Sequence, residues 1–295
     1  MPAMAEPIGI IAGGGDLPLA TAEGIRAAGH PVVAVGLAGQ YSPQLRGVCD
    51  RFHDVGVLRI GEWGRKLRAM GARQAVMVGG VNKSALMYMP MWKKALIFRP
   101  DWRVLWLWYR VTRKDRRSQT LLTAIAEQVR RTGVELIDTT KYIPDHLATA
   151  GVMTRSQPSA EQRQDVEFGW PILMEMNRLE VGQAIAVRHR DVVAVEAVEG
   201  TDAMIRRAGE LSRGGGWCLL KGAGSSKDLR FDVPTIGPKT IESLKAAGAG
   251  CLALDAGRVI LLEKQQTLEA AEAAGIVVLG VGGGGQLPGT AASVG

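Results

Sequence analysis

The sequence predicts an α/β protein with two domains, and three observations support this prediction. The chain has 295 residues, which is more than one typical domain needs. Its first half alternates short apolar runs, typical of buried parallel strands, with amphipathic helical stretches. A segment rich in Pro, Ser, Thr and Gln then interrupts the pattern, and a mixture of hairpins and helices follows.

The first domain, residues 1–141, opens with a short apolar strand, a glycine-rich turn and a helix. Alternating strands and helices of this kind build a parallel sheet covered on both faces, so we expect a Rossmann-like domain. The elements expected, in order, are a strand at 8–12, a helix from the turn to about 28, a strand at 31–35, a helix at 62–70, a strand at 74–78, a helix at 119–131 and a strand at 134–137.

The second domain, residues 165–281, follows a linker at 142–164 and is expected to be a mixed α+β sheet. Residues 282–295 form a glycine-rich tail that has too little apolar surface to fold. The elements expected are helices at 167–178, 201–211, 238–247 and 265–274, hairpins at 183–187 with 192–198 and at 251–254 with 258–262, and strands at 217–221, 229–233 and 276–281.

The composition limits the kinds of ligand and the cellular compartment that we expect for this protein. The formal net charge of +7 favours anionic ligands such as phosphorylated small molecules, while the scattering of Arg and Lys argues against nucleic acid. The 3 cysteines have no metal-ligand spacing and are expected to be free thiols in a reducing compartment. The sequence has no secretion signal and no apolar run long enough to span a bilayer, so we expect a cytoplasmic protein.

The glycine-rich turn at 13–18 joins a strand to the start of a helix, where backbone N–H groups and the helix dipole favour an anion. It departs from the dinucleotide fingerprint, because Pro18 stands at the position of the third glycine and no acidic residue ends the second strand. Two interpretations stay open: a phosphate contact through residues 13–16, or a tight turn required only for packing.

A second candidate site lies at residues 227–234. Read as a strand, this stretch places Asp228, Arg230 and Asp232 on one face and apolar side chains on the other. Two carboxylates beside a guanidinium suit a divalent metal and a phosphate. The alternative is a surface ion network, which would contribute little stability.

Two further segments have open interpretations. Residues 199–202 end a strand and open a helix, which is a ligand position in α/β sheets but also an ordinary helix cap. Residues 88–113 combine Trp with Arg and Lys at a density that suits a lipid–water interface. A helix packed on the sheet would explain the same pattern.

Three motifs in this order resemble the LpxI family, the UDP-2,3-diacylglucosamine pyrophosphatases of lipid A synthesis. The first is the opening Ile-Gly-Ile-Ile-Ala-Gly-Gly-Gly-Asp-Leu-Pro at 8–18. The second joins Val-Gly-Gln at 181–183 to Ala-Val-Glu-Ala-Val-Glu-Gly-Thr-Asp-Ala-Met at 194–204. The third is Arg-Phe-Asp-Val-Pro-Thr-Ile-Gly at 230–237, and together the motifs extend the resemblance over nearly the whole chain.

The resemblance implies Mg²⁺-dependent hydrolysis of a diphosphate, giving UMP and 2,3-diacylglucosamine 1-phosphate. It matches Asp232 to the family's essential aspartate and residues 200–202 to its Gly-Thr-Asp. On this basis we expect catalysis by Asp232, Arg230 and Asp202, and metal binding by Asp232, Asp202 and Asp228. The substrate contacts expected are Gly13, Gly14, Gly15, Asp16, Asn82, Gln183, Gly200, Thr201 and Lys227.

The partner implied is a UDP-linked diacylated glucosamine, met through peripheral contact with the inner membrane; the sequence leaves a homodimer open. Two other classes remain. A dehydrogenase or transferase would need the dinucleotide fingerprint that the first turn departs from. A non-catalytic binding relative is suggested by residues 224–227, which read Gly-Ser-Ser-Lys where the family usually has Lys-Pro-x-Gln.

Overall fold

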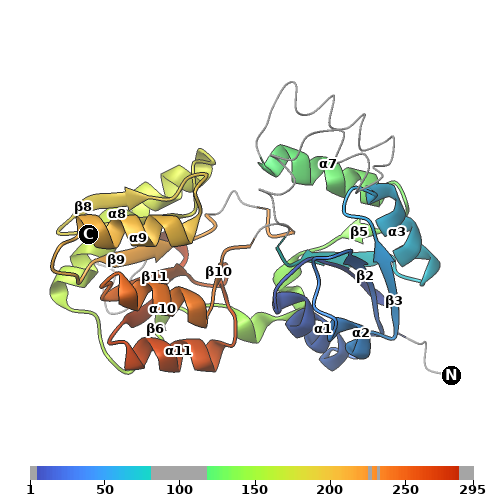
Figure 1. Ribbon diagram of the computed structural model, residues 1–295, viewed down its shortest axis with the longest axis horizontal. Coiled ribbons are helices and arrows are strands. Elements are labelled where there is room, and N and C mark those ends of the chain that lie inside the picture. Colours follow the sequence, from blue (N-terminus) through green and yellow to red (C-terminus); the bar gives the residue numbers. More distant parts are fainter. Residues whose placement is uncertain (1–4, 81–117, 225–227, 231–232, 286–295) are drawn as a thin grey trace. The chain divides into compact units, whose positions relative to one another are not determined.

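The structure is a computed structural model that describes residues 5–80, 118–224, 228–230 and 233–285 (Figure 1). The chain divides into two compact units. The N-terminal unit runs to Ile143 and also includes Arg230. The C-terminal unit runs from Pro144 to Leu229 and continues from Val233. In the described part of the chain, no helix has the length and apolarity needed to cross a bilayer.

The N-terminal unit is built on a five-stranded parallel sheet in the order β3-β2-β1-β4-β5. This is the order of the doubly wound nucleotide-binding fold, so the α/β class is confirmed. The elements of this unit are β1 (Ile8–Ala12), α1 (Leu17–Ala27), β2 (Val32–Leu37), α2 (Leu45–Val48), β3 (Arg51–Val55), α3 (Ile60–Ala69), β4 (Gln74–Val78), α7 (Ser118–Arg130), β5 (Glu135–Leu136) and the 3-10 turn Thr139–Tyr142.

Helices cover both faces of this sheet, which explains why its central strands are apolar throughout (Figure 1). α1 and α2 lie together on one face, and α3 packs with α7 on the other. The edge strand β3 and helix α2 did not appear among the expected elements. β3 is polar and mostly exposed, with only Val55 buried, so it lacks the apolar run that identifies β1 and β2.

The C-terminal unit contains a six-stranded mixed sheet in the order β6-β13-β11-β9-β7-β8. β9, β11 and β13 are parallel, and the other neighbours are antiparallel, which confirms the mixed sheet. Its elements are the 3-10 turn Pro144–His146, β6 (Gly151–Val152), α8 (Ala160–Arg178), β7 (Ala184–Arg188), β8 (Asp191–Val195), α9 (Thr201–Leu211), β9 (Cys218–Lys221), β10 (Thr235–Ile236), α10 (Pro238–Ala246), β11 (Cys251–Asp255), β12 (Ile260–Leu261), α11 (Lys264–Ala273), β13 (Val277–Val281) and the 3-10 turn Gly283–Gly285.

Two hydrophobic cores lie on the two faces of this sheet. Alternate residues of β9 divide between them: Leu219 belongs to the core with residues of α9 and α10, and Leu220 to the core with residues of α8. Strands with both faces buried read as continuous apolar runs, as β9 and β11 do. The polar side chains that end these two strands are therefore exceptions that need a reason.

The structure corrects the strand expected at 229–233. Leu229 and Arg230 lie in a turn, residues 231–232 fall outside the described residues, and Val233 is not in a strand. The ladder begins only after Pro234, whose carbonyl accepts from Ile260 N at 2.9 Å. β10 then pairs in parallel with β12. The alternation of acids that suggested a strand face is thus not a β pattern over Leu229 and Arg230.

The second hairpin and the linker are also corrected. β11 does not pair with β12: it lies between β9 and β13 in the large sheet, while β12 joins β10. Residues 142–164, expected to be a linker, include β6, which pairs with β13, and the start of α8. Ser159 and Gln162 form a capping box there, a local signal that sets the helix start earlier than expected. The glycine-rich tail begins with one 3-10 turn, and residues 286–295 lie outside the described residues.

Candidate functional site

A buried cluster of one acid, one hydroxyl and one lysine lies in the C-terminal unit. The hydroxyl of Thr201 donates to Glu196 Oε1 at 2.8 Å. The ammonium of Lys221 donates to Thr201 Oγ1 at 2.9 Å. Glu196 follows β8, Thr201 is the first residue of α9, and Lys221 is the last residue of β9. Three elements therefore meet at this point.

Two glycines shape the chain around Glu196. Gly200 has φ +85°, which lets the chain turn sharply between the acid and α9. Gly182 lies so close to the end of β8 that a Cβ there would stand 1.9 Å from Glu196 O. Glu196 N also donates to Ala184 O at 2.9 Å. The backbone of Glu196 is thus fixed from two sides.

The cluster is nearly closed to solvent. Glu196 is 6% exposed and Lys221 is 4% exposed. Within the described residues, Glu196 Oε2 has no hydrogen-bond partner. Burying charged groups is costly unless opposite charges and hydrogen bonds offset the loss of water. Lys221 and the positive end of α9 supply such an offset for the carboxylate.

A second buried acid holds the turn that follows Lys221. Asp255 ends β11, and its Oδ2 accepts from Ala223 N at 3.3 Å and from Gly224 N at 3.2 Å. Burial is the main cause that raises the pKa of this carboxyl, and the two backbone donors and Arg258 oppose it. Arg258 Nε lies 3.9 Å from the same oxygen. Asp255 therefore anchors the chain immediately before residues 225–227, which lie outside the described residues.

The glycine turn of the N-terminal unit lies at the carboxyl edge of its sheet. Gly13 N donates to Val78 O at 2.8 Å, and Gly14 and Gly80 exchange two backbone hydrogen bonds at 2.8 and 2.9 Å. The turn after β1 is thus tied to the turn after β4. Because β1 and β4 flank the point where the strand order reverses, this is the edge at which doubly wound sheets bind ligands.

The same bonds refine the role expected of the turn. The N–H groups of Gly13 and Gly14 are both directed at protein carbonyls rather than at a ligand. At Gly15, where φ is +88°, a Cβ would meet nothing within 4 Å, so space is open on that side. Any anion contact made by the turn's backbone therefore falls to Gly15 and Asp16.

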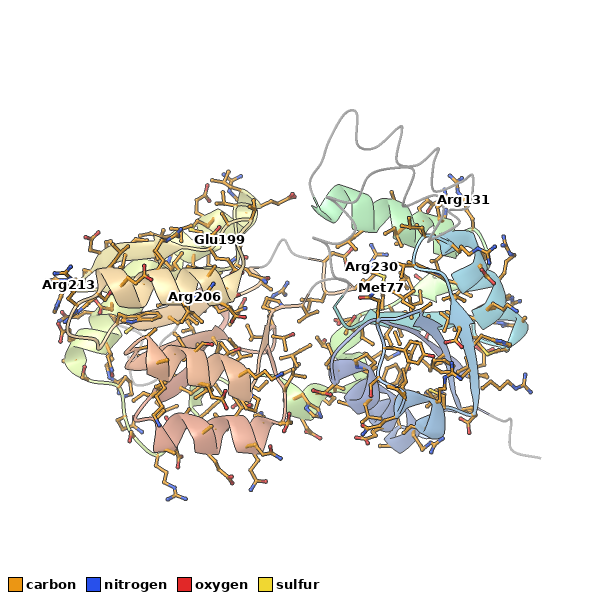
Figure 2. The ribbon with its side chains drawn as sticks, in the orientation of Figure 1. Met77, Arg131, Glu199, Arg206, Arg213 and Arg230 are labelled. Carbon is orange, nitrogen blue, oxygen red and sulfur yellow. The ribbon has the colours of Figure 1, made fainter. Side chains whose placement is uncertain are left out.

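Arg230 is placed differently from the sequence expectation. It belongs to the N-terminal unit, whereas Asp228 belongs to the C-terminal unit. The hydroxyl of Thr139 lies 3.5 Å from Arg230 O and 3.3 Å from Met77 O, which puts Arg230 beside the end of β4 (Figure 2). Arg230 also lines a cavity of about 220 Å³ with Thr123, Ala126, Glu127, Arg130, Glu135 and Leu136.

The remaining expected residues are placed as follows. Asp202 is exposed in the first turn of α9, and Asp228 is half-buried. Gln183 accepts through its backbone oxygen from Gly222 N at 3.1 Å, so it abuts the turn after Lys221. Asn82, Lys227, Asp232 and the Trp-rich segment 88–113 lie outside the described residues.

For a divalent metal, the described part of the chain holds no group of three or more Asp, Glu, His or Cys side chains that could bind one ion. Two of the three expected carboxylate ligands, Asp202 and Asp228, are within it. Their oxygens have the chemistry that Mg²⁺ prefers. The third, Asp232, is outside it, so metal binding stays a prediction.

The site residues expected from the sequence do not include Glu196, Lys221 or Asp255. Two of them carried a usable signal: Lys221 and Asp255 are charged residues at the ends of otherwise apolar, fully buried strands. Glu196 carried a weaker signal, since an acid after a strand is common on a surface. The contact from Thr201 to Lys221 spans 20 residues, and only the fold brings these residues together.

The fold and the candidate site together define a two-unit α/β protein with charged and polar side chains at the carboxyl ends of parallel strands. Comparison with known proteins then identifies the family. The LpxI N-terminal domain matches residues 7–146 and the LpxI C-terminal domain matches residues 149–279. The chain belongs to the LpxI family.

A curated relative agrees with this assignment. The chain is 31% identical over 287 residues to the UDP-2,3-diacylglucosamine pyrophosphatase LpxI of Caulobacter vibrioides, and the match covers 93% of this chain and 97% of the relative. The resemblance inferred from the three motifs is therefore confirmed.

Proposed function

We propose that this protein hydrolyses the diphosphate of UDP-2,3-diacylglucosamine to UMP and 2,3-diacylglucosamine 1-phosphate, a step of lipid A biosynthesis. The observation that carries the proposal is the family match over both units, together with a relative of that name that aligns over nearly its full length. The net charge of +7 suits such an anionic substrate.

The chain's own groups support this chemistry at two strand edges. In the N-terminal unit, space is open beside Gly15, and the N–H groups of Gly15 and Asp16 at the start of α1 are suited to a phosphate or the nucleotide. The backbone of Arg230 lies beside the end of β4 in the same unit, and its guanidinium is the side chain we expect to stabilise charge on phosphoryl oxygens. In the C-terminal unit, Lys221 brings a second cation to the end of β9.

We expect the reaction to need Mg²⁺, held by Asp232, Asp202 and Asp228. When bound, the metal would neutralise the diphosphate and polarise phosphorus. The protein residues orient the substrate and place the attacking water. In this role Asp232 carries the main prediction, because it matches the essential aspartate of the family.

The test is release of UMP from UDP-2,3-diacylglucosamine by the purified protein, before and after chelation and with Mg²⁺ restored. Asp232→Ala should abolish turnover and leave the thermal midpoint unchanged. Asp191→Ala, at the exposed first residue of β8, is the matched control. Turnover that persists in Asp232→Ala would refute the assigned role, and turnover that survives chelation would refute the metal requirement.

A non-catalytic relative that binds lipid or nucleotide sugar is the second candidate, because residues 224–227 depart from the family pattern. Saturable binding of the substrate without UMP release, in the presence of Mg²⁺, would favour it. Clear UMP release would exclude it.

Because the proposed substrate is a lipid, we expect the protein to act at the cytoplasmic face of the inner membrane. We expect the protein to be cytoplasmic and to contact that membrane peripherally through the Trp-rich segment. Replacing Trp106 and Trp108 with Ser should weaken cosedimentation with liposomes; unchanged association or plain unfolding would favour a core role for these rings. A homodimer stays a prediction that light scattering can check.

A further inference from the structure

We infer that Glu196 is a positioning residue for the proposed reaction: through the hydroxyl of Thr201 it fixes the ammonium of Lys221, which gives its charge to the substrate's diphosphate. This inference rests on the proposed function. It assigns a role to a buried acid outside the expected catalytic set.

The hydrogen bonds in the cluster have a defined direction. An ionised Glu196 can only accept, so the single hydroxyl hydrogen of Thr201 must point toward it. Thr201 Oγ1 then turns its lone pairs toward Lys221, which donates one of its three N–H groups. The acid thereby sets the orientation of the hydroxyl, and the hydroxyl sets the position of the ammonium.

This direction also limits what Thr201 can do for a ligand. Its only hydrogen is already used, so it has no donor left for a phosphate oxygen. The cation that it holds brings a positive charge to the same point, which attracts an anion. The contact expected between Thr201 and the substrate therefore becomes, in this proposal, a contact made through Lys221.

The cluster is poorly explained as a device for stability. Leu219, two residues before Lys221, points to the same face of the sheet and belongs to the core beneath α9. An apolar side chain at Lys221 could extend that core, and buried ion pairs are often no more stabilising than apolar groups of similar size. The chain instead keeps two nearly buried charges there and leaves Glu196 Oε2 without a hydrogen-bond partner among the described residues.

The position of the cluster indicates what it serves. Lys221 ends β9 at the edge where the parallel strands β9, β11 and β13 all have their carboxyl ends. Ligands of α/β sheets lie at such edges. The turn that follows is held by Asp255, and Asp228, one of the expected metal ligands, comes shortly after this turn in the sequence. A cation fixed at this point suits a diphosphate that lies beside a carboxylate-bound metal.

The experiment measures kcat and KM for UMP release, with the thermal midpoint, in Glu196→Gln, Thr201→Val, Thr201→Ser, Lys221→Met and the double variant Glu196→Gln/Lys221→Met. Glu196→Gln keeps the size of the side chain but removes the charge that orients Thr201. We expect kcat/KM to fall about 10- to 100-fold, as for other residues that orient a ligand-binding group. Glu199→Gln is the control, because Glu199 is a neighbouring acid that pairs with Arg207 instead.

Two comparisons separate positioning from mere structure. Thr201→Ser retains the hydroxyl and should be about tenfold more active than Thr201→Val. If the acid acts through the lysine, adding Glu196→Gln to Lys221→Met should cost little more than Lys221→Met alone. Thr201→Val also tests the inference if Glu196→Gln does not fold.

The outcomes distinguish the two proposals. A wild-type protein that releases no UMP refutes the proposed function, and this inference with it. An active wild-type protein with normal kcat/KM in Glu196→Gln refutes the inference alone. The inference would also be refuted if the losses in kcat/KM from Glu196→Gln and Lys221→Met multiplied in the double variant. It would be refuted as well if activity fell only in variants whose thermal midpoint is lowered.

Discussion

Replacing Gly13 with Ala should destabilise the N-terminal unit and reduce activity. A Cβ at this position would stand 2.7 Å from both Gly79 O and Gly80 O. These are backbone atoms of the turn after β4 and cannot rotate away as a side-chain end can. Gly13 does not have a positive φ, so the substitution adds no backbone strain of that kind. It therefore tests only the close packing between the two turns.

The magnitude follows from the geometry. Ordinary contact begins near 3.4 Å, so the two turns would have to separate by about 0.7 Å. That shift would stretch the paired hydrogen bonds between Gly14 and Gly80, now 2.8 and 2.9 Å. Overpacking typically costs about 1–3 kcal/mol and a weakened hydrogen bond about 1 kcal/mol, so we expect a loss of about 2–4 kcal/mol.

Calorimetry measures the thermal unfolding of the variant, and release of UMP measures its activity. For a unit of this size the loss corresponds to a decrease of about 5–15 °C in its unfolding midpoint. The control is Gly47→Ala in α2, where the added Cβ meets nothing within 4 Å. That change should be neutral or stabilising by up to about 1 kcal/mol, since Ala favours helices. An unchanged midpoint in Gly13→Ala would refute the close packing of the two turns.

Three further predictions concern the C-terminal unit and the thiols. Gly182→Ala should lower both stability and kcat/KM, because its Cβ would lie 1.9 Å from Glu196 O; normal stability would contradict this packing. Burial raises the pKa of Asp255, so its contribution to stability is complete below about pH 3.9 and is lost as the pH rises through the folded-state pKa. Asp255→Asn should remove that loss in urea unfolding measured across pH, and an unchanged pH profile would contradict it. Burial raises the pKa of the Cys49 thiol to about 11, and a hydrogen bond with Cys251, together with burial, raises the pKa of Cys218. A disulfide reagent at pH 8 should therefore modify the native protein slowly and reach 3 thiols only after unfolding. Rapid modification of the native protein would contradict this.

The local pattern of apolar and polar residues was sufficient to predict most helices and strands of the fold. The apolar runs of β1, β4 and β9 were read within a residue of their bounds, because strands buried on both faces leave a continuous signal. β3 was not predicted, because an exposed edge strand has no such apolar run. The second hairpin was wrong because two apolar runs around a glycine do not show which strand each will pair with.

The candidate site likewise contains residues that the local sequence placed correctly and residues whose positions depend on distant contacts. Gly200 and Thr201 were placed correctly at a strand–helix junction, since that junction is encoded locally. Arg230 was not, because its assignment to the N-terminal unit depends on a contact with Thr139 that is 91 residues away in sequence. The partnership of Thr201 with Lys221 is equally nonlocal. Pairing of buried charges across elements is a property of the fold that no window of residues contains.

The two units offer an anion different kinds of group. At the end of β1, two of the glycine N–H groups are directed at protein carbonyls, so the groups we expect to meet an anion among the described residues of this unit are the backbone donors of Gly15 and Asp16 and the side chain of Arg230. At the end of β9, a lysine is held in a nearly closed setting by a buried acid. A charge in such a setting is less screened by water than one on the surface, so its interaction with a phosphoryl group is stronger. This difference is why we expect Lys221 and its orienting acid, more than the glycine turn, to determine the rate of the proposed reaction.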